Sequence, residues 1–183
     1  LAGLIGPRHF GKPKTIQATI GYLEGQWTRM GYPVSRECYD AYGEVGTNLI
    51  VEQSGAKRPD EIILLGAHYD TVFSTPGADD NASAVAVLLE ASRLLWEYRG
   101  KRTIRYVAFA CEEPPYFNLE SMGSQHHARQ ARLRGEKIRG MLCMEMVGYY
   151  NTDDHSQTVP PLIPKWLHRL DRKSTRLNSS HSS

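Results

Sequence analysis

The chain has 183 residues, 40% of them apolar, which is enough for one domain with a hydrophobic core. Its 22 lysines and arginines nearly balance 20 aspartates and glutamates, and no basic stripe suggests nucleic acid. No apolar stretch approaches the roughly 20 residues that cross a bilayer, so no membrane span is predicted. Residues 1–30 lack the basic start and apolar stretch of a signal peptide, and localisation stays open.

The first part of the chain predicts a helix followed by strands. Over residues 15–30, apolar residues recur at spacings of four and three, which is one face of an amphipathic helix. Two strands are predicted over residues 34–39 and 47–53. The short apolar run at 62–65, closed by Gly66, predicts a strand that is buried on both faces.

The following residues alternate helices with strands. Apolar patterning predicts a helix over 81–98, a buried strand over 104–110, a helix over 123–134 and an apolar strand over 138–146. This alternation favours a three-layer α/β/α fold with a mostly parallel central sheet. In such sheets ligands bind beyond the carboxyl ends of the strands.

The end of the chain differs in kind. Residues 171–183 are rich in serine and show no apolar periodicity, which is typical of translated cloning sequence or of a disordered terminus. We therefore predict one domain over residues 1–170 and exclude the tail from the fold.

Acidic and histidine side chains follow the predicted strands. His68 and Asp70 are two residues apart at a strand end, which places both side chains on one side. A histidine that binds zinc usually donates its other ring N–H to a carboxylate, and Asp70 suits that role. Alone, the pair is more typical of a surface histidine beside an aspartate in a turn.

Asp79 and Asp80 lie in a tight segment between Pro76-Gly77 and the next predicted helix. A carboxylate held there suits a bridge between two cations about 3.5–4 Å apart. Spacing alone favours a simpler role, in which these acids complement the helix dipole and Asp80 or Asn81 caps the helix.

Three further acidic residues are harder to explain by surface solvation. Glu112 and Glu113 directly follow a buried strand, where a charge needs a compensating partner. One carboxylate of such a pair can bind a metal while its neighbour accepts a proton from metal-bound water. Glu145 lies between Met144 and Met146 in an apolar run, and its burial would likewise require a cation or hydrogen-bond donors.

The motifs GAHYDT, PGADDNAS, the glutamate pair and MEMVGYY, in this order and at these separations, resemble the co-catalytic zinc aminopeptidases of metallopeptidase family twenty-eight. Relatives of that family include glutaminyl cyclases and glutamate carboxypeptidase-like enzymes. The resemblance implies a zinc-dependent exopeptidase with two zinc ions that acts on peptides with a free N-terminus. It also implies roles for single residues: zinc binding by His68 and Glu145, a second zinc on Glu113, a bridge by Asp79, general base catalysis by Glu112, orientation of His68 by Asp70, and a cis peptide bond between Asp79 and Asp80.

The chain departs from the family pattern in its last ligands. The family often has an aspartate where Glu145 stands, and it has a further histidine well beyond that strand. His155 and His168 do not match the family spacing, so we expect a partial catalytic domain over residues 1–170. We expect this chain to retain one zinc ion, to bind a second weakly, and to have little or no peptidase activity.

Two other functions remain open. One is a glutaminyl cyclase-like enzyme, and the other is a non-catalytic peptidase-like binding domain. Because all but one of the expected site positions are occupied, the pattern favours an enzyme over a binding domain.

Overall fold

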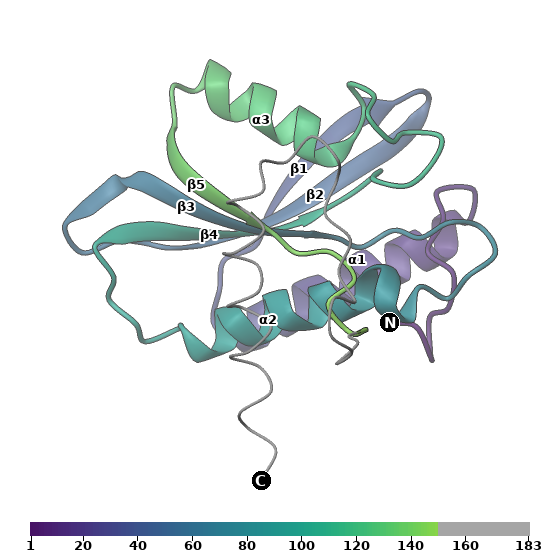
Figure 1. Ribbon diagram of the computed structural model, residues 1–183, viewed down its shortest axis with the longest axis horizontal. Helices are drawn as coiled ribbons and strands as arrows, with labels where there is room; N and C mark the ends of the chain where they lie inside the picture. Colours follow the sequence, from purple (N-terminus) through teal and green to yellow (C-terminus); the bar gives the residue numbers. More distant parts are fainter. Residues whose placement is uncertain (150–183) are drawn as a thin grey trace, which may run out of the picture. The chain divides into compact units, whose positions relative to one another are not determined.

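A five-stranded mixed sheet forms the centre of the computed structural model, which describes residues 1–149. The strands lie in the order β1-β2-β4-β3-β5 (Figure 1). β3 pairs in parallel with β4 and β5, as the alternation predicted. β1 and β2 add antiparallel pairings, so the sheet is mixed. The strand bounds are β1 Ser35–Ala41, β2 Glu44–Gln53, β3 Arg58–His68, β4 Arg102–Phe109 and β5 Lys137–Cys143.

The antiparallel pairing of β1 and β2 has a local cause. Ala41 pairs with Glu44, so only Tyr42 and Gly43 connect the two strands. Both have a positive φ, 54° and 89°, which two-residue hairpin turns require. The sequence prediction located both strands, but it did not assign this hairpin.

Within residues 1–149, three helices cover the sheet: α1 Pro13–Arg29, α2 Ala84–Leu94 and α3 Gly123–Leu133. Figure 1 shows α1 and α2 on one face of the sheet and α3 on the other, which confirms the three-layer α/β/α fold. The predicted face of the first helix is the buried one, since Ile16, Ile20, Leu23 and Trp27 lie in the main core. Among residues 1–149, no helix has the length and apolar character that crossing a membrane needs.

The second helix is shorter than predicted. Residues Ala78–Ser83 form an irregular turn (η1), and α2 ends at Leu94 instead of residue 98. No side-chain hydrogen bond caps η1 or α2, so the predicted capping role of Asp80 or Asn81 is wrong. Beyond the C-terminal end of α2, the Gln53 side chain donates hydrogen bonds to the carbonyls of Trp96 and Tyr98. These carbonyls thus have hydrogen-bond partners without a continued helix.

The last strand also ends early, and this matters for the site. β5 ends at Cys143, so Glu145 follows the strand instead of lying inside it. Met141 and Leu142 are exposed, because among the described strands β5 has a neighbour on one side only. Because β3 is parallel to both β4 and β5, the carboxyl ends of these three strands lie at the same edge of the sheet. The predicted site residues follow these ends.

Parts of the predictions lie outside the described residues. These are the segment 150–170 of the predicted domain, the tail 171–183, His155 and His168.

Candidate metal centre

The side chain of His68, the last residue of β3, is at the middle of the site and is only 3% exposed. Its Nε2 atom lies 3.2 Å from Oδ1 of Asp80 and 3.3 Å from Oε2 of Glu145. Oε2 of Glu112 is 3.6 Å from the same nitrogen. Three carboxylates from three separate segments thus converge on one imidazole nitrogen.

Asp70 lies on the other side of the imidazole and joins two strands. Its Oδ1 is 3.5 Å from Nδ1 of His68, a close contact without hydrogen-bond geometry. Its two oxygens accept hydrogen bonds from the backbone N–H groups of Glu112 and Glu113, at 3.1 and 3.0 Å. Asp70 therefore ties the turn after β4 to the end of β3.

Glu113 is a buried acid of the site that has an unpaired side-chain oxygen among the described residues. The residue is 7% exposed, and its Oε1 atom is buried with no hydrogen-bond partner among the described residues. Ligand atoms of Glu113, His68 and Asp80 all lie within 4.8 Å of one another. Burying a carboxylate oxygen without a donor is costly, and a cation removes that cost. A histidine nitrogen with carboxylate oxygens is a donor set that zinc accepts, so the residues fit this metal.

The charges of the site perturb one another. Burial opposes a positive charge on His68, but the carboxylates of Asp70 and Glu145 outweigh it and raise its pKa to about 11. Burial and the nearby charge of Asp80 raise the pKa of Glu113 to about 7. Burial also raises the pKa of Glu112, against the opposing pull of His68. Carboxylates with raised pKa values are ionised only at a cost, which a bound cation offsets.

The adjacent acids Asp79 and Asp80 point to different partners. Oδ1 of Asp79 accepts hydrogen bonds from the backbone N–H of Gly148 at 2.8 Å and from the Ser83 hydroxyl at 3.1 Å. Asp80, and not Asp79, reaches His68. These contacts do not favour the bridging role that the family resemblance implied for Asp79.

The backbone around these acids accounts for the difference. Asp80 and Asn81 have non-helical conformations, with φ and ψ of −94° and 95° at Asp80. Their side chains therefore do not follow the regular directions that a helix would impose. The predicted cis peptide bond between Asp79 and Asp80 is also wrong, because the cis bond lies between Asp80 and Asn81.

Asn81 is a site residue that the sequence reasoning missed. Its Nδ2 donates to the carbonyl of Met144 at 3.0 Å and to Oε2 of Glu145 at 3.2 Å. Its Oδ1 accepts from the N–H of Met146 at 3.2 Å. Asn81 thus holds the segment after β5 against η1. The side chain of Glu145 is 47% exposed, so the predicted cost of burying its charge does not arise. Its predicted place beside His68 agrees with the contact between the two side chains.

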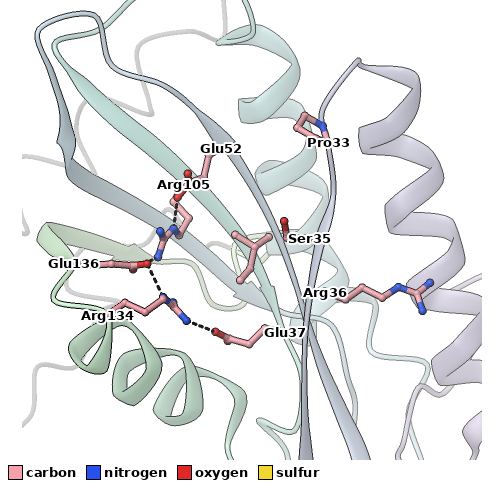
Figure 2. A pocket seen from close by; sticks show the side chains of 9 residues that line it. Pro33, Ser35, Arg36, Glu37, Glu52, Arg105, Arg134 and Glu136 are labelled. Carbon is pink, nitrogen blue, oxygen red and sulfur yellow. Dashed lines mark hydrogen bonds and ion pairs between the residues drawn. The ribbon is translucent and has the colours of Figure 1, made fainter.

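A second group of charges lies beside the end of α3, away from these residues. It lines a pocket of about 420 Å³ (Figure 2). Arg105 pairs there with Glu52 and Glu136, and Arg134 pairs with Glu37 and Glu136. Because these charges satisfy one another, the pocket shows no unpaired group that calls for a ligand. We take it as a structural ion-pair network.

This network predicts a loss of stability in acid. Burial opposes ionisation of Glu37, but hydrogen bonds from His127 and Asn48 outweigh it and lower its pKa to about 2. Burial likewise opposes ionisation of Glu136, and Arg105 and Arg134 lower its pKa to about 2. A folded-state pKa below the ordinary 4.5 stabilises the fold above pH 4.5, and this contribution is lost as the pH falls toward 2.

Urea unfolding of the metal-free protein between pH 5.5 and 3 measures this loss. The variant Glu136→Gln should show a smaller drop in the free energy of unfolding across that range. Glu90→Gln is the control, because Glu90 and its partner Arg93 are both more than half exposed and such pairs contribute little. A Glu136→Gln variant with the pH dependence of the wild type would contradict the prediction.

Fold and site together define an α/β/α protein with a candidate metal centre of histidine and carboxylate side chains at the carboxyl edge of its sheet. The family model of peptidase family M28 matches residues 48–181, more than half of the chain. The chain belongs to peptidase family M28, a family of zinc metallopeptidases, which confirms the family expected from the motifs.

Three similar proteins illustrate the relationship. The uncharacterized protein YfbL of Escherichia coli (strain K12) is 34% identical over 176 residues, which are 92% of this chain and 53% of that protein. The structure of the glutaminyl cyclase of Porphyromonas gingivalis matches with a TM-score of 0.66 and 30% identity, over 79% of this chain and 55% of that one. A leucine aminopeptidase precursor from Bacteroides thetaiotaomicron matches with a TM-score of 0.65 and 26% identity, over 80% and 59%.

These matches bear on fold and activity differently. The chain spans about half the length of the E. coli protein and less than two thirds of the other two. A cyclase and an aminopeptidase match almost equally well, so the overall fold does not separate the two activities.

Proposed function

We propose that this protein is a zinc-dependent aminopeptidase, which hydrolyses the first peptide bond of a substrate with a free N-terminus. The observation that carries the proposal is the convergence of Asp80, Glu112 and Glu145 on the buried His68, beside a Glu113 oxygen that has no partner among the described residues. Membership of family M28 and the likeness to an aminopeptidase support it.

The geometry suggests how the ligands are divided. His68, Asp80 and Glu145 would hold one zinc ion, and Asp80 with Glu113 would hold a second. Asp80 takes the bridging role first predicted for Asp79. Zinc supplies a Lewis acid for the substrate carbonyl and lowers the pKa of water.

The remaining acids would act on protons and on orientation. Glu112 would accept a proton from the attacking water and return it to the leaving amine, since it is near the ligands and its side chain is 26% exposed. Asp70 would hold the turn that carries Glu112 and Glu113 and would orient His68.

Metal titration tests the ligand division. The described residues offer three protein donors to one ion, the usual number in catalytic zinc sites, and only two to the other. We therefore expect calorimetry of the chelator-treated chain to show one tight and one weaker zinc site, with low peptidase activity. Two equally tight sites would contradict this division, and no zinc binding would contradict the metal centre itself.

The cyclase alternative has a specific basis in the match to a glutaminyl cyclase. Mass spectrometry of a peptide that begins with glutamine, incubated with the zinc-loaded protein, separates the possibilities. Release of free glutamine supports the aminopeptidase, whereas loss of ammonia from an intact peptide supports a cyclase. Zinc binding without either product, on this and other peptides, would favour a binding domain.

A further inference from the structure

A fully buried arginine lies next to the metal centre, in the segment that precedes α1. Arg8 is 0% exposed. Its Nε donates to the carbonyl of Tyr69 at 2.7 Å, and its Nη2 donates to the carbonyl of Gly77 at 2.9 Å. Its Nη1 donates to the carbonyls of Pro76, at 2.7 Å, and Gly6, at 3.0 Å. One guanidinium thus bonds four backbone oxygens.

Three of these oxygens belong to the loop that connects β3 to η1. Tyr69 lies between His68 and Asp70, while Pro76 and Gly77 come shortly before Asp80. Arg8 therefore holds both ends of the loop through one planar group. Backbone contacts add to this, since the N–H of Arg8 donates to the Thr71 hydroxyl at 2.9 Å and the N–H of Thr71 donates to the Arg8 carbonyl at 3.3 Å.

Gly77 allows this close approach. Its φ is +55°, a conformation that side chains rarely adopt. A Cβ atom at this position would lie 2.3 Å from the carbonyl oxygen of Asp80 and 2.8 Å from Nη2 of Arg8. The guanidinium, Gly77 and the Asp80 backbone are consequently packed closely against one another.

The bonding pattern leaves the carboxylate of Asp80 available. The hydrogen bonds of the Arg8 guanidinium go to carbonyl oxygens, and no ion pair between Arg8 and a site carboxylate occurs within residues 1–149. Arg8 therefore does not compete with a metal ion for the Asp80 carboxylate.

We propose that Arg8 is a positioning residue of the metal centre, which holds the Asp80 carboxylate at His68 by fixing both ends of the loop between β3 and η1. The inference rests on the proposed function in one respect, because the site that it serves is the proposed zinc site. The loop itself can be tested in metal-free protein.

The test compares Arg8→Lys and Arg8→Met with the control Ser92→Ala. Ser92 is also fully buried, on the inner face of α2, and its hydroxyl accepts a hydrogen bond from the Trp27 ring N–H at 3.0 Å. The zinc affinity of each variant is measured at the same number of degrees below the melting temperature of that variant. We expect zinc affinity to fall about 10- to 100-fold in both Arg8 variants, as for lost supporting partners of metal ligands, and to stay near the wild-type value in Ser92→Ala.

Hydrogen exchange in chelator supplies the second readout. The amides of residues 70–82 should exchange faster in the Arg8 variants, while those of α1 and β4 keep the wild-type rate. A folded Arg8→Lys variant with wild-type zinc affinity and wild-type exchange in this loop would overturn the proposal. If wild-type protein binds no zinc, the proposed function fails, and loop exchange alone decides the role of Arg8.

A milder variant covers the case in which neither Arg8 variant folds. Thr71→Val removes one hydrogen bond of the same contact with a near-isosteric side chain. Faster exchange in residues 70–82 of that variant supports the proposal, and unchanged exchange overturns it.

Discussion

Replacing Asp80 by asparagine is expected to weaken zinc binding by at least about 100-fold, because losing a direct ligand should cost no less than losing a supporting partner of a ligand, which costs about 10- to 100-fold. Asp80 contacts His68 at 3.2 Å and is grouped with Glu113, so its carboxylate would serve both ions. Asparagine keeps the shape of the side chain but loses the negative charge. Zinc competition against a chromophoric chelator measures the change.

The neighbouring aspartate is the matched control. In Asp79→Asn the side-chain oxygen can still accept the hydrogen bonds from Gly148 and Ser83, so zinc affinity should stay close to that of the wild type. Melting temperatures in chelator check that both variants are folded. Equal losses of affinity in the two variants would contradict the separate roles of Asp79 and Asp80, and a loss in Asp79→Asn alone would support the bridging role that the resemblance implied for Asp79.

The second large effect is expected at the glutamate pair. Glu112→Gln should reduce whatever hydrolysis of an aminoacyl coumarin the chain shows by about 10²- to 10⁴-fold, the usual contribution of a general base. Zinc binding should persist, because Glu112 is assigned to proton transfer and not to metal binding. Rates at saturating zinc, together with calorimetry, measure both quantities.

Glu113→Gln is the matched variant and should behave differently. Its buried Oε1 belongs to the metal group, so we expect the weaker zinc site to be lost while the tighter site remains. If instead Glu112→Gln abolished zinc binding and Glu113→Gln left it intact, the two roles would have to be exchanged.

Much of the fold could be predicted because its signals are local. The spacing of Ile16, Ile20, Leu23 and Trp27 marks a helix face, and these residues are buried in α1. The apolar runs before His68 and Glu112 became the central strands β3 and β4. Periodicity records which face of an element is apolar, and burial of that face follows directly.

The boundaries were less predictable where a distant partner sets them. The residues beyond Leu94 carry apolar side chains that would continue a helix, but Gln53 of β2 binds the carbonyls of Trp96 and Tyr98. The strand after α3 ends before Glu145 for a similar reason, since the Asn81 side chain forms hydrogen bonds with the carbonyl of Met144 and the N–H of Met146. Such bonds link residues that are far apart in the sequence, so no local pattern reports them.

The sequence by itself determined the kind of site: histidine and carboxylate donors at the ends of successive strands, in the order of family M28. Only the tertiary structure decided which of two adjacent aspartates faces His68. In an irregular turn, side-chain direction follows from backbone angles. Here Asn81 of the turn bonds to the distant Met144 carbonyl, and the buried Arg8 bonds to the Gly77 carbonyl just before the turn. Residue type is a property of the sequence, whereas the direction of a side chain in such a turn depends on its long-range partners.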